Sequence, residues 1–135
     1  MALSPNAKLR LAELAKQGDM VAQALSADAQ DIVLTAGVEA ANVITVTGQI
    51  VDGLGTPIAG VQNVVVTSIP VSGAGTMTAG GTGTVKAGSA SKEVWIQTDA
   101  TGKFSVGVLN VAVEDNLVRA VTANGEVAML KLTYA

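Results

Sequence analysis

Two copies of one turn signature constrain the fold of this chain more than any other feature of its sequence. They occupy residues 52–57 (Asp-Gly-Leu-Gly-Thr-Pro) and 98–104 (Thr-Asp-Ala-Thr-Gly-Lys-Phe), and each follows a run of alternating apolar residues. In Asp-x-x-Gly the aspartate places an acceptor at the start of a tight turn, and the glycine tolerates a positive φ near its end. Such turns reverse strands, so we expect a mostly β chain in which Asp52, Gly55, Asp99 and Gly102 have structural roles.

Runs rich in β-branched residues predict where the strands lie. They occupy residues 43–51, 64–69, 92–97, 103–109, 116–123 and 126–134, and a first or edge strand is expected near residues 32–34. Roughly seven short strands separated by turns are typical of two packed antiparallel sheets. The sequence therefore predicts an antiparallel β-sandwich domain over residues 29–135.

The dipeptide Asn124-Gly125 predicts the last hairpin of this sandwich. A two-residue type I′ turn needs a positive φ at both central residues, and asparagine followed by glycine meets this requirement at low cost. We therefore expect the final two strands to pair across Asn124 and Gly125.

The three aromatic residues of the chain, Trp95, Phe104 and Tyr134, all fall in predicted strands. Aromatic rings bury large apolar areas and often dominate the packing of a core. We expect all three to be packing residues, with Trp95 as an anchor of the core. The alternative for Trp95 is a contact with a partner.

The first 28 residues predict a helical arm ahead of the sandwich. Ser4 and Pro5 are a typical N-cap and first-turn proline, and apolar residues then recur at spacings of three and four. Gly18 weakens such a helix by roughly 1 kcal/mol relative to alanine, so any break is expected there. Because a short helix is not stable alone in water, the apolar stripe packs either on the β body or on another subunit or protein. The candidate contact residues of this stripe are Leu11, Leu14, Val21 and Leu25.

The segment 71–90 differs in composition from the rest of the chain, since it consists largely of glycine, threonine, serine and alanine. It contains no phosphate-binding glycine motif. Its alternating threonines permit either a loosely ordered hairpin or an exposed loop. Loops of this length are usually functional or disordered. We expect a surface loop that becomes ordered against a neighbouring molecule, with Thr76, Met77 and Thr78 as contacts, and an idle loop is the alternative.

The chain contains neither cysteine nor histidine. This absence removes the Ser-His-Asp and Cys-His arrangements and nearly all metal sites built from nitrogen and sulfur ligands. The carboxylates Asp52 and Asp99 lie in turns, and Glu114 and Asp115 are adjacent, without an EF-hand loop or a dense acidic cluster. We therefore expect no enzyme activity, no cofactor and no bound metal.

The charge of the chain also narrows the choice of partners. A net charge of -3 with eight scattered basic residues argues against nucleic acid. No stretch of about 18 apolar residues is available to span a bilayer, and the N-terminus lacks the apolar segment of a signal peptide. We expect synthesis in the cytoplasm and no membrane association.

Residues 46–61, followed by residues 98–104, resemble the bacterial immunoglobulin-like and carboxypeptidase-regulatory-like β-sandwich families. In those families a D-x-x-G-x-P-I-x-G-V segment and a T-D-A-x-G-x-F segment recur in this order. The resemblance covers roughly residues 41–134 and implies an immunoglobulin-like sandwich. Its motifs are more specific for fold than for function, because such sandwiches serve as adhesin modules, enzyme appendages and virion surface proteins.

A solitary sandwich with a helical arm is similar to the capsid decoration, or cement, proteins of tailed bacteriophages. This resemblance implies a non-enzymatic virion protein that stabilises the outer head surface, with the major capsid protein or another virion protein as partner. Homo-oligomers are expected, and many weak sites on a repeating shell would hold each subunit through avidity. The alternatives are a tail, neck or fibre protein of a virion, and a carbohydrate-binding or adhesive module in a cellular setting.

Overall fold

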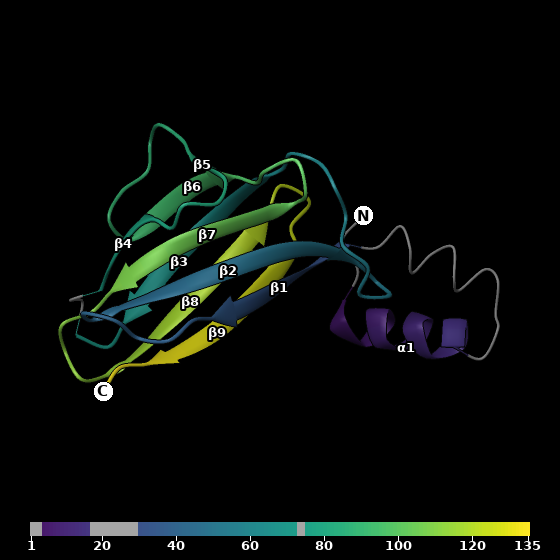
Figure 1. The fold of residues 1–135 in the computed structure, drawn as a ribbon. Coiled ribbons are helices and arrows are strands. Elements are labelled where there is room, and N and C mark those ends of the chain that lie inside the picture. Colours follow the sequence, from purple (N-terminus) through teal and green to yellow (C-terminus); the bar gives the residue numbers. More distant parts are fainter. Residues whose placement is uncertain (1–3, 17–29, 73–74) are drawn as a thin grey trace.

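The computed structural model describes residues 4–16, 30–72 and 75–135 of the chain. Figure 1 shows a helix beside a β-sandwich, so the prediction of a mostly β chain with two antiparallel sheets is confirmed. The elements are α1 (Pro5–Lys16), β1 (Gln30–Ala36), β2 (Val43–Asp52), β3 (Asn63–Pro70), β4 (Thr76–Ala79), β5 (Thr84–Val85), β6 (Glu93–Gln97), β7 (Lys103–Leu109), β8 (Asp115–Thr122) and β9 (Val127–Thr133).

The two sheets are antiparallel throughout. The four-stranded sheet has the order β1-β2-β7-β4, and the five-stranded sheet has the order β5-β6-β3-β8-β9. The edge strands β1 and β9 run side by side in the same direction (Figure 1). Asn124 Nδ2 donates to Gln30 Oε1 at 2.8 Å near the start of both strands, and the backbone N–H of Ala135 donates to Glu39 Oε2 at 2.9 Å near their ends.

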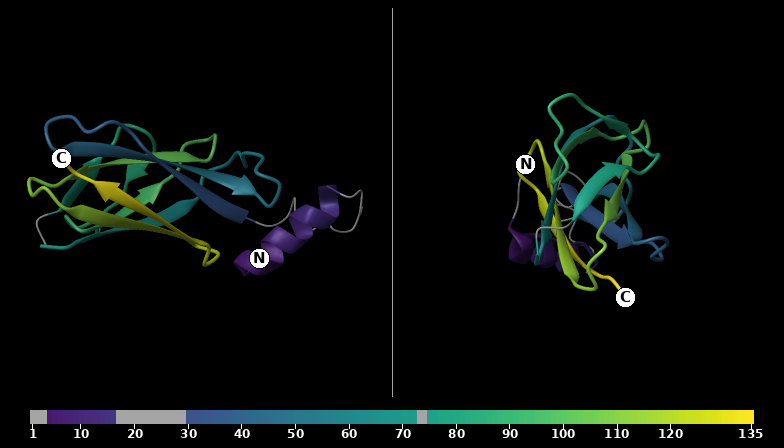
Figure 2. Two further views of the ribbon diagram at one scale, coloured as in Figure 1. Left: turned by 90° about the horizontal axis from the view of Figure 1, so that it is seen from below. Right: turned by 90° about the vertical axis from the view of Figure 1, so that its left-hand side faces the viewer.

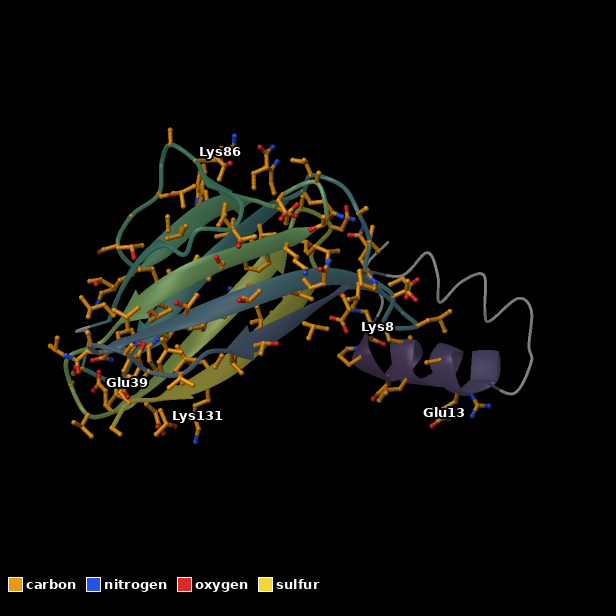
Figure 3. The ribbon with its side chains drawn as sticks, viewed as in Figure 1. Lys8, Glu13, Glu39, Lys86 and Lys131 are labelled. Carbon is orange, nitrogen blue, oxygen red and sulfur yellow. The ribbon has the colours of Figure 1, made fainter. Side chains whose placement is uncertain are left out.

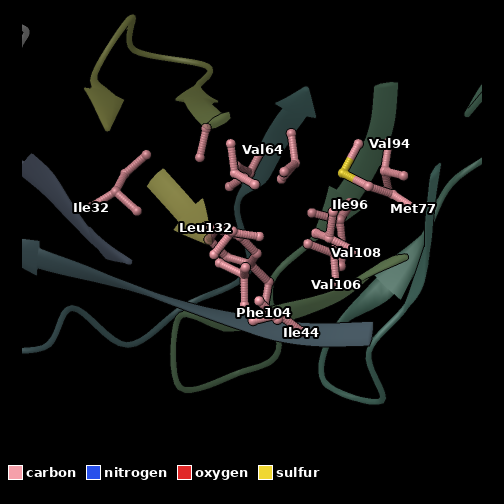
Figure 4. Close-up of a cluster of buried hydrophobic side chains, with 14 of the residues drawn as sticks. Ile32, Ile44, Val64, Met77, Val94, Ile96, Phe104, Val106, Val108 and Leu132 are labelled. Carbon is pink, nitrogen blue, oxygen red and sulfur yellow. The ribbon is translucent and has the colours of Figure 1, made fainter. Parts of the chain in front are cut away.

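Alternate residues of the strands form the core between the sheets (Figure 4). This period of two follows from the pleat, which turns successive side chains to opposite faces. Phe104 is fully buried, and Tyr134 is 3% exposed, so the packing roles predicted for both are confirmed. The Tyr134 hydroxyl donates to the Val108 carbonyl at 2.6 Å, and burial raises the pKa of Tyr134 to about 12.

Three turns of the sandwich share one backbone pattern, over residues 52–56, 99–103 and 122–126. In each, the carbonyl of the first residue accepts the N–H of the fourth, and the N–H of the first donates to the carbonyl of the fifth. The fourth residues are Gly55, Gly102 and Gly125, with φ of 83°, 78° and 84°. This is the pattern of a three-residue hairpin loop that ends in a left-handed glycine.

The aspartates of the two signature turns cap them as predicted. Asp99 Oδ1 accepts the N–H groups of Thr101 at 2.8 Å and Lys103 at 3.1 Å, and Asp52 Oδ1 accepts the equivalent pair at 2.9 Å. The hydrogen bond from the Thr101 hydroxyl, followed by that from the Lys103 N–H, lowers the pKa of Asp99 below its usual range. The structural roles predicted for Asp52 and Asp99 are confirmed.

The hairpin at Asn124 and Gly125 is confirmed, but its predicted type I′ geometry is wrong. β8 and β9 pair across it, yet the described non-glycine residues with a positive φ are Ala41 and Asn42. One left-handed residue, Gly125, is enough for a three-residue loop, so Asn124 need not adopt a positive φ. The type I′ pattern occurs instead at Ala41-Asn42, where Ala40 and Val43 exchange both backbone hydrogen bonds at 2.9 Å.

The N-terminal helix begins as predicted, but its described part, Pro5–Lys16, is shorter than the predicted arm over residues 1–28. The backbone N–H of Ala7 donates to Ser4 Oγ at 3.2 Å, which confirms the N-cap. Leu11 and Leu14 lie on α1, and their side chains are outside the described part of the structure. Gly18, Val21 and Leu25 also lie outside the described residues.

The Gly/Thr-rich segment 71–90 is not an open loop. It contributes β4 to one sheet and β5 to the other, because its alternating threonines fit the period of a strand. Met77 is 5% exposed in the core, so its prediction as a partner contact is wrong. Thr76 is half-buried and Thr78 exposed on the edge strand β4.

The prediction that Trp95 anchors the core is also wrong. Val94 and Ile96 point inward with 2% and 1% exposure, so the alternation of β6 turns Trp95 outward, where it is 46% exposed. The backbone of Gly88 lies against its ring, and the Trp95 N–H donates to Ser89 Oγ at 3.0 Å. The alternative role for Trp95, a contact with a partner, stays a prediction.

Candidate functional site

The large apolar side chains most exposed in the described part of the chain all lie at one end of the sandwich. They are Val38, Val71, Val113 and Val111, with 92%, 80%, 79% and 70% exposure. Val38 belongs to the β1–β2 loop, Val71 to the β3–β4 loop and the other two to the β7–β8 loop. We call these four residues the valine end. Exposed apolar groups that gather in this way mark interaction surfaces.

Strand pairing explains why these three loops meet. Leu109 at the end of β7 pairs with Val43 at the start of β2 and with Thr76 at the start of β4. Asn116 near the start of β8 pairs with Pro70 at the end of β3. The β1–β2, β3–β4 and β7–β8 loops are therefore brought to the same end, opposite α1 (Figure 2).

Glu114 fastens two of the loops to each other. Its carboxylate accepts the Ser72 hydroxyl at 2.8 Å, the Ser72 N–H at 3.1 Å and the Asn110 side-chain amide at 2.9 Å. Asn110 Oδ1 in turn accepts the N–H of Ala112 at 2.9 Å. Val71, Val111 and Val113 are thus adjacent to positions already held by hydrogen bonds, so less conformational entropy is lost there on binding.

The third loop is held in the same way. The Asn110 N–H donates to the Asn42 carbonyl at 3.0 Å, and Glu39 accepts the Ala135 N–H at 2.9 Å. Glu39 lies close to the C-terminus in Figure 3. The alanine at a left-handed φ of 52°, Ala41, is in this loop. Strained backbone of this kind occurs preferentially at functional sites.

Acid is expected to weaken the hydrogen bonds that Glu114 accepts at the valine end, and so to lower the free energy of unfolding. Hydrogen bonds from Asn110 and then Ser72 lower the pKa of Glu114 below its usual range. The carboxylate stabilises the fold fully above the pKa of an unfolded glutamate, about 4.3, and this contribution is lost as the pH falls through the folded pKa. Glu114→Gln should therefore reduce the loss of unfolding free energy between pH 6 and pH 3, measured by urea denaturation. The control is Glu13→Gln on the exposed side of α1; equal acid sensitivity in both variants would contradict the assignment.

A second exposed apolar surface lies on the outer side of the five-stranded sheet. Trp95, Val65, Val121 and Val127 are directly opposite one another on β6, β3, β8 and β9. We call the outward side of these four strands the tryptophan face. Hollows of about 400 Å³ and 260 Å³ flank Val65 on its β8 and β6 sides.

The junction between α1 and the sandwich contains a charged cluster (Figure 3). Lys8 Nζ bonds Glu126, whose side chain is 4% exposed, and lies 3.6 Å from Asp31 Oδ1. Leu9, beside it, is 65% exposed. A lysine between two carboxylates neutralises a buried charge, so the cluster attaches α1 to the β8–β9 hairpin.

Among the described residues, no three histidine, cysteine, aspartate or glutamate side chains form a group that could hold a metal ion. In the same described ranges, no helix has the length and apolar character needed to cross a membrane. The signature carboxylates Asp52 and Asp99 are used in turns.

The surface residues predicted from the sequence and those found in the structure are largely different. Of the predicted contact residues whose side chains the structure describes, Thr76 and Thr78 on β4 are half-buried and exposed, respectively. The valine end was missed, although a signal existed: valines occur beside turn-forming residues between predicted strands. The high strand propensity of valine explains its presence in strands, but it does not explain a valine in a turn.

Comparisons with known proteins identify the fold. No family model matches the chain, and no curated protein matches it in sequence. A Parabacteroides merdae β-glucuronidase structure is similar with a TM-score of 0.56 and 16% identity, over 79% of this chain and 12% of that chain. The Yersinia pseudotuberculosis adhesin InvE is similar with a TM-score of 0.53 and 18% identity, over 78% of this chain and 32% of that chain. The chain thus spans a minor part of either protein, and identities this low show a shared β-sandwich alone.

Proposed function

We propose that this protein is a non-enzymatic structural component of a bacteriophage particle that binds the outer head surface and stabilises it. The observation that carries the proposal is the valine end, where exposed apolar side chains sit on three loops joined by hydrogen bonds. Exposed valines beside hydrogen-bonded positions suit an apolar hollow on a large protein partner, because they bury area on contact at little entropic cost. The partner is the major capsid protein or another virion protein.

The repeating partner surface explains why a small contact is sufficient. Four valines bury far less area than the roughly 800 Å² per partner of a standard interface. Many such contacts on one particle raise the effective affinity, particularly if the protein binds as a homo-oligomer. The resemblance of residues 46–61 and 98–104 to sandwiches that include virion surface proteins supports this setting.

Co-sedimentation with assembled phage heads tests the proposal. Wild-type protein should sediment with heads, and the combined variant Val38→Ser, Val71→Ser, Val111→Ser and Val113→Ser should bind about 100-fold more weakly or worse, because it loses apolar area at every contact. Leu54→Ser with Val61→Ser is the matched control, since both are exposed apolar residues away from the valine end. Wild-type protein confined to the unassembled fraction would overturn the proposal, and cryo-electron microscopy would distinguish head from tail positions.

A carbohydrate-binding or adhesive role is the second candidate. Trp95 is exposed, and Asn63 and Gln97 lie directly opposite each other in the adjacent row of the same sheet. An aromatic ring beside side-chain amides is a combination that can stack on and hydrogen-bond a sugar. The similar fold of the adhesin InvE is compatible with it. Retention on polysaccharide that Trp95→Ala abolishes would favour this function over head binding.

A further inference from the structure

The tryptophan face carries more apolar surface than the outer side of a sheet needs. Antiparallel sheets that face water usually alternate apolar residues inside with polar residues outside. Here Trp95 and Val127 are 46% and 44% exposed at the two ends of an apolar row that crosses four strands. Met129, in the adjacent row, is 55% exposed. This face therefore resembles the centre of an interface, where tryptophan and methionine are enriched.

The charged side chains on this face fall into two groups, the ion pair of Lys131 with Asp115 at 3.6 Å, and Glu93 and Arg119. β3 lies between β6 and β8, and Thr67 of β3 pairs with Glu93 on β6 and with Arg119 on β8. Their backbones are therefore two strand spacings apart, roughly 10 Å. Among the described residues, no ion pair joins the side chains of Glu93 and Arg119 within one chain. Both are exposed, and each is next to the apolar row.

We propose that the tryptophan face is a homodimer interface, and that its occupant is a second copy of this chain. A two-fold axis along β3 exchanges the positions of β6 and β8 between the copies. Glu93 of each copy then meets Arg119 of the other, Trp95 meets Val121, and Thr67 and Val65 meet their own counterparts. Two outer faces of twisted sheets pack in this aligned way at about 30°. Glu93 and Arg119 are thus self-complementary across the axis, which is the condition for an isologous contact.

Charge reversal tests this geometry. Wild-type protein should be a dimer by sedimentation velocity, with a Kd that increases with salt. Glu93→Arg and Arg119→Glu should each weaken the dimer about tenfold or more, since each places like charges opposite one another. The double reversal should restore the dimer. Thr47→Arg, on the exposed side of β2 in the other sheet, is the control and should leave the Kd unchanged.

Trp95 supplies an independent measurement because it is the only tryptophan in the chain. Its emission should shift to shorter wavelength as dilute monomer is concentrated, and either single reversal variant should need about tenfold higher concentration or more for the same shift. Circular dichroism checks that each variant is folded. Wild-type protein that is still monomeric at about 100 μM would overturn the proposal, because a specific homodimer interface should associate well below this concentration. A dimer with unchanged Trp95 emission would also overturn it, as would a double reversal that does not restore the dimer. An emission shift that only polysaccharide causes would likewise contradict the proposal.

The dimer and the head-binding proposal can fail separately. The tryptophan face and the valine end share no residue, so reversal of Glu93 or Arg119 leaves the four valines intact. Loss of the dimer with retained head binding would confine the failure to this inference.

Discussion

Replacing Phe104 with alanine is expected to lower the free energy of unfolding by about 3–5 kcal/mol. Phe104 is completely buried and belongs to the core between the sheets (Figure 4). Its aromatic ring also covers Gly48, its direct cross-strand partner on β2. The variant would therefore leave a cavity that β2 and β7 cannot close, and urea denaturation followed by far-UV circular dichroism would measure the loss.

Gly48 provides the matched test of this packing. A Cβ at position 48 would overlap the Phe104 ring, so Gly48→Ala should cost about 1–3 kcal/mol through overpacking. In the double variant with Phe104→Ala the new methyl group has room, and the total loss should be smaller than the sum of the two single losses. Additive losses would show that the ring does not lie over Gly48.

Gly102→Ala is expected to cost about 3 kcal/mol or more, because two separate penalties combine there. Its φ of 78° is unfavourable for any residue with a Cβ, and the added Cβ would also overlap the Ile58 carbonyl oxygen. That carbonyl belongs to backbone, which cannot move aside as a flexible side chain can. The free energy of unfolding, again from urea denaturation, measures the effect.

Gly55 and Gly125 isolate the first penalty from the second. They occupy the same place in the same turn pattern, with φ of 83° and 84°, but a Cβ at either position meets nothing within 4 Å. Alanine at each should therefore cost only the strain of a left-handed residue, about 1–2 kcal/mol. If all three alanine variants lost the same stability, the contact between Gly102 and Ile58 would be absent in solution.

The local features of this protein were determined by its sequence. The turns at Asp52 and Asp99 and the strands beside them could be predicted because a positive φ at glycine and the period of a strand depend on a few adjacent residues. The N-cap at Ser4 was predictable for the same reason. Asn124-Gly125 was predictable as a reversal but not in its type, since the loop length that decides the type depends on how β8 and β9 pair.

The surfaces were decided by the tertiary structure. Alternation places Trp95 on the opposite side of β6 from Val94 and Ile96, but only the packing of the two sheets determines which side is the core. The space between them is filled by these smaller side chains and by Phe104. In the same way, no local pattern brings Val38, Val71 and Val111 to one end. Strand order and register do so, because they are properties of pairings between residues far apart in the chain.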